Sequence, residues 1–407
     1  MSEEFYRIKR LPPYVIAEVN AMRHAARRAG RDVIDLGMGN PDQPPPQHVI
    51  DKLCEVAAKP AAHGYSQSKG IPGLRRAQAN YYARRFGVEL DPEREVVVTM
   101  GSKEGLSSMA TAITAPGDVV LAPSPTYPIH TFGFIIAGAT IRAVPTTPDE
   151  RYWKALDNAM AFTVPRPTVL VVNYPSNPTA EVVDVAFYQR LVDWARENQV
   201  WVLSDLAYSE LYFDGKPTPS ILQARGAKDV AVEFTSMSKT YSMAGWRMGF
   251  AVGNQELIAA LTRVKSYLDY GAFTPIQAAA CAALNGPQDV VEQNRERYRR
   301  RRDVMVESFT RAGWPIPAPA ASMFAWAPLP PGFEGMGSLE FSKRLLEHAG
   351  VAVAAGVGYG EEGEGFVRIA MVENEQRIRQ AARSVKRFLA EHTPAAQPVA
   401  FARRAQA

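Results

Sequence analysis

The stretch Thr235–Phe250, TSMSKTYSMAGWRMGF, decides the fold class of this chain. It places Lys239 among serines, with Arg247 eight positions later. A lysine on a solvated helix face commonly has a carboxylate four positions away, and Lys239 has none. The apolar run DVAVEF directly before the stretch predicts a buried strand, so we expect Lys239 at the end of that strand. Open α/β proteins place their chemistry at this edge of the sheet.

The middle of the chain alternates short β-branched runs with amphipathic stretches such as FYQRLVDWARENQ (187–199). Seven runs predict strands, at residues 96–99, 118–122, 139–144, 168–173, 200–205, 229–236 and 249–253. Near-continuous apolar strands separated by helices are typical of a mostly parallel sheet that is covered on both faces. We therefore predict an α/β fold in which a mostly parallel seven-stranded sheet forms a large domain, residues 46–285.

The pattern of the chain changes after residue 285. It predicts an arginine-rich helix, a proline-punctuated edge strand in PIPAPAASMFAWAPL, a helix in SLEFSKRLLEHAG, the strand FVRIAM and a last helix from Glu375 to about residue 390. These elements indicate a smaller α+β domain, residues 286–390. We expect residues 1–45 to form an arm and one helix that pack with the small domain, and residues 391–407 to form a frayed, disordered tail. The 407 residues exceed the usual size of a single core, which agrees with two domains.

The composition narrows the classes of function. The formal charge of +4 is small for this length and the basic residues are scattered, which argues against a nucleic-acid partner. The two cysteines, Cys54 and Cys281, lie far apart and predict neither a disulfide framework nor a metal site. The opening MSEEFYRIKR lacks the apolar region of a signal peptide, and the longest near-apolar run, FGFIIAGATI, is too short to span a bilayer. We therefore expect a cytoplasmic protein without a membrane partner.

The segment Thr99–Gly105, TMGSKEG, follows a predicted strand and opens a predicted helix. Glycine allows a close backbone approach, and the first N–H groups of a helix are unpaired and positively polarised, a geometry that binds phosphate. The alternative is an ordinary turn with Ser102 as the helix N-cap, and a short glycine loop alone does not decide between the two.

Two further segments place polar side chains after strands. In Asn173–Thr179, NYPSNPT, two prolines fix the turn and aim Asn177 from a rigid loop. In Ser204–Tyr208, SDLAY, an apolar strand ends in Asp205, an acid that needs a partner at the edge of a buried sheet. A helix N-cap explains Asp205 equally well.

The opening stretch carries the strongest chemical signal. A desolvated Lys239 favours its neutral amine and becomes a nucleophile that can form a Schiff base, which we favour over a surface lysine in a loop. Ser236, Ser238 and Arg247 are hydroxyl and guanidinium donors suited to a phosphate. Tyr127, in SPTYP, offers a ring for stacking, although a tyrosine alone is more often part of a core. A phosphate cradle, an aimed amide, an acid and an activated lysine at the ends of one sheet are the groups that pyridoxal 5′-phosphate requires.

The motifs GSKEG, SNPT, SDLAY, SMSKTYSMAGWRMGF and FVRIAM occur in an order and spacing that resembles the class I/II, fold type I aminotransferases, which depend on pyridoxal 5′-phosphate. The resemblance extends from LPPY to the last helix. It implies that Lys239 is the Schiff-base lysine and proton shuttle and that Asp205 pairs with the pyridine nitrogen. It further implies that Asn177 and Tyr208 bond the phenolate oxygen and that Tyr127 stacks on the ring. The implied phosphate ligands are Ser102, Lys103, Ser236, Ser238 and Arg247.

The same resemblance implies how the substrate and a second subunit take part. Arg368, in FVRIAM, matches an arginine that binds the substrate α-carboxylate, and the backbone of Gly39, in GMGNPD, approaches the same group, with Asn177 beside it. Tyr65, in HGYSQSKG, matches a tyrosine that reaches the cofactor phosphate of the partner subunit, so a homodimer with shared active sites is implied. Tyr14 and Arg23 are the candidates to meet the second carboxylate of glutamate.

One departure concerns specificity. Many members of the family read NPTG, whereas this chain reads NPTA with Ala180. Together with RLPPY, GMGNPD, HGYSQSKGIPGLRRA and KSYLDYGAFTPIQ, this wording is similar to the bacterial alanine (glutamate–pyruvate) aminotransferases. Residues 266–277 contain no arginine or lysine, so this loop offers no cation to a side-chain carboxylate such as that of aspartate. The resemblance therefore implies amino transfer between L-alanine and 2-oxoglutarate in a ping-pong cycle. The alternatives are an LL-diaminopimelate, aspartate, branched-chain or broad-specificity aminotransferase, or a β-eliminating lyase.

Two other classes are less favoured by the sequence. The stretch GVGYG (356–360) resembles part of a dinucleotide-binding motif, but it does not run from a strand into a helix within a βαβ unit, so we expect a loop. A transcription regulator of the same fold would need a DNA-binding domain, and we expect no room for one before LPPY.

Overall fold

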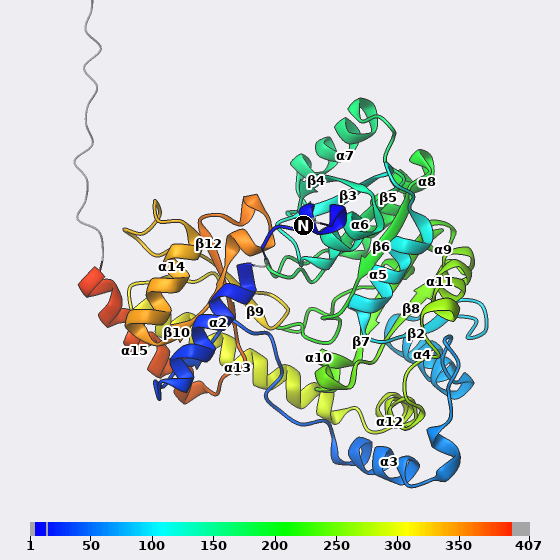
Figure 1. Ribbon diagram of the computed structural model, residues 1–407, viewed down its shortest axis with the longest axis horizontal. Helices are drawn as coiled ribbons and strands as arrows, with labels where there is room; N and C mark the ends of the chain where they lie inside the picture. Colours follow the sequence, from blue (N-terminus) through cyan, green and yellow to red (C-terminus); the bar gives the residue numbers. More distant parts are fainter. Residues whose placement is uncertain (1–4, 14, 393–407) are drawn as a thin grey trace, which may run out of the picture.

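The computed structural model describes residues 5–13 and 15–392, and a seven-stranded sheet forms the centre of its larger part. The strands, in chain order, are β2 (Val96–Thr99), β3 (Val119–Ser124), β4 (Thr140–Pro145), β5 (Val169–Asn173), β6 (Trp201–Asp205), β7 (Ala231–Ser236) and β8 (Gly249–Gly253). Their order across the sheet is β2-β8-β7-β6-β5-β3-β4, and β8 runs antiparallel to both of its neighbours while the other pairs are parallel. The predicted mostly parallel α/β sheet is confirmed, and all seven predicted strands are present (Figure 1).

Four strands (β3, β4, β5 and β6) begin one residue later than the sequence predicts, and β7 begins two residues later. The apolar run begins at residue 229, but β7 begins at Ala231 because Asp229 and Val230 close the short helix α9 (Ala227–Val230). The apolar pattern continues across the boundary because Val230 is buried as well.

Helices cover both faces of this sheet, as continuous apolar strands require. One face packs against α5 (Ser102–Ile113), α6 (Ile129–Ala137) and α11 (Gln255–Leu268). The other packs against α3 (Gln47–Ala57), α4 (Pro72–Phe86), α7 (Glu150–Phe162), α8 (Val185–Asn198) and α12 (Thr274–Asn285). In β5, Val169 and Val171 join the first core, whereas Leu170 and Val172 join the second, because successive side chains of a strand point to opposite faces. We call this sheet and its helices the large unit.

A smaller assembly with its own core lies beside the large unit, and we call it the small unit. Its sheet has the order β11-β12-β9, from β9 (Phe324–Pro328), β11 (Ala354–Ala355) and β12 (Phe366–Ala370). Strand β9 lies at the edge of this sheet, as its flanking prolines predict. The helices are α13 (Asp289–Arg311), α14 (Ser338–Arg344), which continues as one π-helical turn (Leu345–Ala349), and α15 (Glu375–His392).

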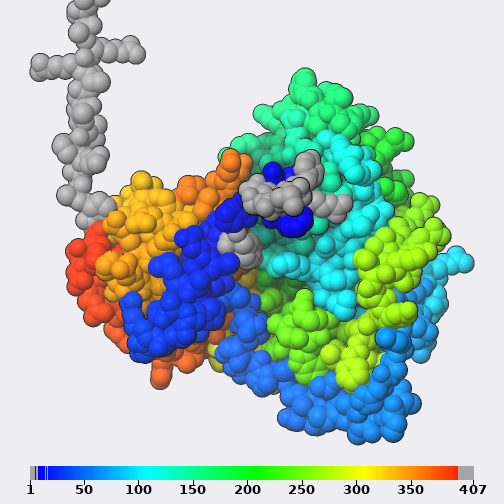
Figure 2. All heavy atoms as spheres, in the orientation of Figure 1, coloured from blue at the N-terminus to red at the C-terminus, as the bar shows by residue number. Residues whose placement is uncertain are grey.

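The N-terminal segment joins the two units. Helix α1 is Tyr6–Lys9, and the Arg10 side chain after it donates to the Ala139 carbonyl of the large unit at 3.0 Å. Helix α2 (Val15–Arg28) then lies on the small unit, and β1 (Ile34–Asp35) pairs in parallel with β10 (Val351–Ala352) there. Figure 2 shows this blue helix against the yellow and orange surface of the small unit.

The remaining elements are short. They are α10 (Met237–Thr240) and the 3₁₀ turns Pro60–His63, Ile221–Gln223, Ala244–Trp246, Gly356–Tyr359 and Glu361–Gly363. The stretch GVGYG thus forms a 3₁₀ turn between two strands of the small unit and opens no α-helix, as predicted. Helix α15 extends two residues beyond the predicted limit of 390, and the rest of the predicted tail lies outside the described residues. The predicted domain limits at 45 and 285 remain a proposal, which the two separate cores support.

Two absences apply to residues 5–13 and 15–392 only. None of their helices combines the length and the hydropathy that crossing a membrane needs. They also contain no cluster of three or more histidine, cysteine or carboxylate side chains arranged to hold a metal ion.

Candidate active site

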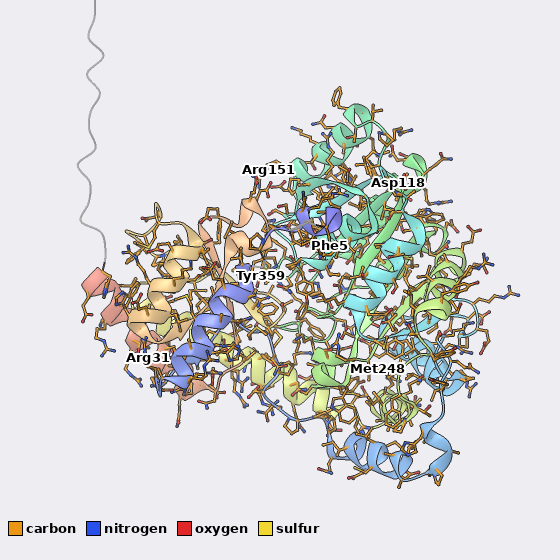
Figure 3. All side chains as sticks on the ribbon, viewed as in Figure 1. Phe5, Arg31, Asp118, Arg151, Met248 and Tyr359 are labelled. Carbon is orange, nitrogen blue, oxygen red and sulfur yellow. The ribbon has the colours of Figure 1, made fainter. Side chains whose placement is uncertain are left out.

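The carboxyl ends of the central strands open into one pocket of about 270 Å³ between the two units. Helix α5 follows β2, the loop Asn173–Thr179 follows β5, Asp205 ends β6, and α10 with Lys239 follows β7. The pocket collects most of the side chains that the sequence singles out: Gly39, Ser102, Lys103, Tyr127, Asn177, Asp205, Tyr208, Ser236, Ser238, Lys239, Arg247 and Arg368. Figure 3 shows the side chains that fill the region between the two units, where Tyr359 of the small unit is labelled.

A cradle without side-chain bulk lies at the start of α5. Gly101 has φ 83°, and a Cβ atom there would lie 2.4 Å from Nη2 of Arg247. A Cβ atom at Gly249 would lie 2.9 Å from the backbone N of Ser102, so both glycines are required for this close approach. The Arg247 guanidinium also donates to the carbonyl of Met100 at 3.3 Å. The cradle therefore combines helix N–H groups with a nearby guanidinium, and this donor set suits a phosphate.

Lys239 is half-buried at the floor of the pocket, and its Nζ donates to the carbonyl oxygen of Gly39. Burial lowers the pKa of Lys239 to about 7, and the charges of Arg368 and Arg247 lower it further in the same direction. Buried cations usually pair with a carboxylate. Among the described residues, no carboxylate forms an ion pair with the Lys239 amine. A large fraction of Lys239 is therefore a neutral amine near pH 7.

Asp205 is buried beside a histidine that the sequence analysis did not single out. Oδ2 of Asp205 lies 2.9 Å from Nε2 of His130, whose Nδ1 lies 2.7 Å from Oγ1 of Thr126. Oδ1 accepts from the backbone N of Ala207 at 3.1 Å. The only sequence signal for His130 is its position three residues after Tyr127, and its contact with Asp205 depends on β3, β5 and β6 being neighbours in the sheet.

Asn173 is a second residue that the sequence analysis left without a role. Its Oδ1 accepts from the backbone N of Asn177 at 2.8 Å, and its Nδ2 donates to the Asp205 carbonyl at 2.8 Å. One amide therefore fixes the loop after β5 and the end of β6 relative to each other. This clamp orients the side chain of Asn177 toward the small unit.

Arg368 projects from β12 into the pocket and is 5% exposed. Its Nη1 donates to Oδ1 of Asn177 at 2.8 Å, and its Nη2 donates to the Gly37 carbonyl at 2.8 Å. The guanidinium stacks 3.9 Å from the centre of the Phe324 ring, a residue that the sequence analysis did not predict. Nε of Arg368 is buried without a partner, and no carboxylate of the described chain pairs with the group. A buried, oriented and unneutralised guanidinium is suited to bind a carboxylate ligand.

Three predicted residues line the rim or the wall of the pocket. The Tyr127 ring lies 5.8 Å from Nζ of Lys103, which places both beside the cradle. The Tyr208 ring packs edge-on against Phe324 at 5.6 Å, and burial raises the pKa of its hydroxyl.

The structure does not bring every predicted residue to this pocket. Tyr65 is 87% exposed, its ring lies tilted 4.6 Å from that of Tyr270, and it does not line the pocket of its own chain. Arg23 is a poor candidate for a substrate carboxylate because its guanidinium already pairs with Asp35. Tyr14 lies outside the described residues.

Ala180 has a conformational meaning that the sequence alone does not give. Its φ is 59°, in the left-handed region that favours glycine. This backbone angle suits the glycine of the sequence NPTG that the family resemblance leads us to expect, so Ala180 is not itself evidence about the substrate.

The chain matches the family model described as "Aminotransferase class I and II" over residues 31–385. It belongs to the class I and II aminotransferases. It is 63% identical over 387 residues to AatC of Rhizobium meliloti (strain 1021), whose name assigns it to the aminotransferases, covering 95% of this chain and 96% of that one. It is 50% identical over 382 residues to glutamate-pyruvate aminotransferase AlaC of Escherichia coli (strain K12), covering 94% and 93%. It is 43% identical over 387 residues to LL-diaminopimelate aminotransferase of Moorella thermoacetica, covering 95% and 98%.

Solved structures agree with the fold. Substrate-bound BacF of Bacillus subtilis superposes with a TM-score of 0.88 at 34% identity, covering 95% of this chain and 98% of that one. A double mutant of Thermus thermophilus aspartate aminotransferase superposes with a TM-score of 0.87 at 30% identity, covering 96% and 100%. The predicted family and fold type I architecture are confirmed, and the cofactor of this aminotransferase is pyridoxal 5′-phosphate.

The residues of the pocket fit this cofactor. The cradle at Gly101 admits a phosphate only because no Cβ fills it. Asp205 has a histidine rather than an arginine or lysine as its side-chain partner, so it can accept a hydrogen bond from a protonated ring nitrogen. Lys239 supplies an amine with a lowered pKa between these two groups.

Proposed function

We propose that this aminotransferase moves an amino group between L-alanine and 2-oxoglutarate, giving pyruvate and L-glutamate in a ping-pong cycle. The observation that carries the amino-acid part is Arg368, a buried guanidinium with an unpartnered Nε in the same pocket as the neutral amine of Lys239. The choice of alanine is supported by the 50% identity to a glutamate-pyruvate aminotransferase.

Different residues of the pocket hold different parts of the cofactor. When bound, pyridoxal 5′-phosphate supplies a carbon that accepts the amino group and a ring that takes up electrons from the substrate. Ser102, Ser236, Ser238 and Arg247 would hold its phosphate, with Lys103 nearby, and Tyr127 would support its ring. Asp205, held by His130, keeps a proton on the ring nitrogen. Asn177 and Tyr208 would donate to the phenolate oxygen.

Arg368 and Lys239 act on the substrate. Arg368 binds the α-carboxylate from a fixed direction, because Asn177 and the Gly37 carbonyl hold two of its nitrogens. The backbone of Gly39 lies beside this position. Nζ of Lys239 would take the proton from the substrate α-carbon and deliver it to the cofactor carbon that accepts the amino group, which its lowered pKa permits near pH 7.

The test measures L-glutamate formed from L-alanine and 2-oxoglutarate by the purified protein loaded with pyridoxal 5′-phosphate, because L-glutamate is the product common to all amino donors. L-Aspartate and LL-diaminopimelate serve as paired donors at the same concentration. We expect the highest kcat/KM with L-alanine. A higher kcat/KM with LL-diaminopimelate would establish the second candidate, which the 43% identity to such an enzyme favours, and would refute the alanine assignment.

We also propose that the enzyme is a cytoplasmic homodimer. An exposed apolar surface around Tyr65 supports the dimer, with Tyr267 87%, Leu268 66% and Tyr270 63% exposed. The free state of both cysteines supports a reducing compartment. Residues 266–277 do not line the pocket of their own chain, and in the proposed dimer they would lie, with Tyr65, near the pocket of the partner. Light scattering should give a mass of two chains, and Tyr65→Ala should weaken cofactor binding.

A further inference from the structure

Lys265 is a fully buried lysine that takes no part in the reaction proposed above. It lies on α11, and its side chain is 1% exposed. Its Nζ lies 3.2 Å from Oε2 of Glu104 and 2.9 Å from Oδ2 of Asp269. A buried cation between two carboxylates is costly to assemble, so its position calls for an explanation.

Glu104 connects this lysine to the phosphate cradle. It occupies the first turn of α5, two residues after Ser102, and its Oε2 accepts from the backbone N of Met100 at 2.8 Å. The carbonyl of Met100 accepts from Arg247. The peptide groups just before Gly101 are thus held from one side by Glu104 and from the other by Arg247.

This arrangement has an electrostatic consequence. The Met100 N–H needs an acceptor, and Glu104 supplies one, but it also brings a negative charge to the turn that receives a phosphate. Lys265 contacts both carboxylate oxygens of Glu104, at 3.3 and 3.2 Å, and offsets that charge.

Asp269 fixes the lysine in place. Its Oδ1 accepts from the backbone N of Gly271 at 2.6 Å, and its carbonyl accepts from Oγ of Ser68. A Cβ atom at Gly271 would lie 2.2 Å from the Gln67 carbonyl, so the two loops that carry Tyr270 and Tyr65 are in backbone contact here. Lys265 is therefore held by a rigid support on the side opposite Glu104.

We propose that Lys265 is a positioning residue for cofactor binding: it cancels the charge of Glu104 and holds that side chain against Met100, so that the cradle accepts a phosphate. Lys265 does not touch the cofactor and acts through Glu104. The proposal rests on the cofactor of the family and is independent of the amino-acid substrate.

The experiment compares two ligands of the cofactor-free protein, pyridoxal 5′-phosphate and pyridoxal, whose Kd values are measured by quenching of tryptophan fluorescence. We expect Lys265→Met to raise the Kd for pyridoxal 5′-phosphate by about tenfold or more and the Kd for pyridoxal by less than about twofold, because only the first ligand carries the phosphate that Glu104 repels. Lys228→Met, which removes a partly exposed partner of Glu95 in the same unit, is the matched control and should change neither Kd.

A double variant that lacks both the Glu104 and the Lys265 charge provides the second comparison. Glu104→Gln combined with Lys265→Met removes both charges and keeps an acceptor for Met100, so its Kd for pyridoxal 5′-phosphate should return to within about threefold of the parent value. Equal losses for the two ligands, or a folded double variant that binds as weakly as Lys265→Met, would overturn the proposal in favour of a packing role. If Lys265→Met does not fold by circular dichroism, the double variant alone decides, because weak phosphate-dependent binding by it would contradict the proposal.

Discussion

Lys239 and Lys265 are both withdrawn from water, yet only Lys265 meets carboxylates within the described chain. The buried arginines divide in the same way. Arg302 forms two hydrogen bonds with Asp214, at 2.6 and 2.9 Å, whereas Arg368 has no carboxylate partner among the described residues. The cations without a carboxylate line the pocket, and the paired ones connect structural elements. An unneutralised buried cation therefore marks a place reserved for a ligand, whereas a neutralised one marks structure.

The largest expected effect is the loss of kcat on removal of the Lys239 amine from the pocket. Lys239→Ala should lower kcat for the alanine reaction by at least about a thousandfold, because it removes the group that transfers the proton. The cradle and Asp205 are untouched, so a spectral titration should still show bound cofactor. Lys228→Met removes a partly exposed lysine of the same unit and should leave kcat within about twofold of the parent value. Turnover by Lys239→Ala near the parent rate would refute the role of this amine.

Arg368 and Arg302 test the same distinction, between buried cations without and with a carboxylate partner, through KM and Tm. Arg368→Gln should raise the KM for L-alanine by about a hundredfold, because the α-carboxylate loses a charge-assisted pair in a buried site. Arg302→Gln should leave this KM unchanged and lower the Tm, because Asp214 loses its partner. Steady-state kinetics and calorimetry on both variants test this. A KM effect from Arg302→Gln as large as that from Arg368→Gln would remove the distinction.

The elements that the sequence predicted well are those with local signals. The seven strands are continuous apolar runs because both faces of the sheet are covered, and the motif residues follow those strands directly. The division between the two classes of cation was not predictable, because it depends on distant partners. Glu104 lies 161 positions from Lys265, and Phe324 meets Arg368 only once β9 and β12 pair.

His130 and Ala180 illustrate the same limit. His130 is 75 positions from Asp205, and no motif connects them in the sequence. The positive φ of Ala180 follows from the fold of its loop. The difference between NPTA in this chain and the family motif NPTG could therefore not be interpreted before the backbone was known. Tertiary contacts and backbone angles, rather than composition, assign these residues their roles.

The cost of an unneutralised cation should be visible as a pH dependence of stability. Lys239 has a pKa of about 7 in the folded chain against its usual 10.5, so below pH 7 both states carry the charge and only the folded state is penalised for burying it. As the pH rises from 7 to 10.5 the unfolded state binds more protons, and the stability of the parent protein rises. Lys239→Met should therefore stabilise the cofactor-free protein by about 2 kcal/mol below pH 7, after allowance for partial solvent access, and by less toward pH 10.5. Calorimetry across this range checks the trend, and a constant difference would contradict it.

The smallest expected effect is on the free energy of unfolding. It tests whether burial, rather than ion pairing itself, distinguishes the cations reserved for ligands from the structural ones. Lys343 pairs with Glu18 at 2.6 Å between α14 and α2, and the two side chains are 29% and 52% exposed. Water screens such a pair, so Lys343→Met should lower the free energy of unfolding by less than about 1 kcal/mol, and 1 M salt should remove most of the difference. Arg302→Gln, measured by the same calorimetry, should cost more and respond less to salt, since its guanidinium is buried. Equal costs for the two substitutions would mean that pairing alone, and not desolvation, sets the energy of these cations, and the interpretation of Lys239 and Arg368 as sites reserved for ligands would lose its physical basis.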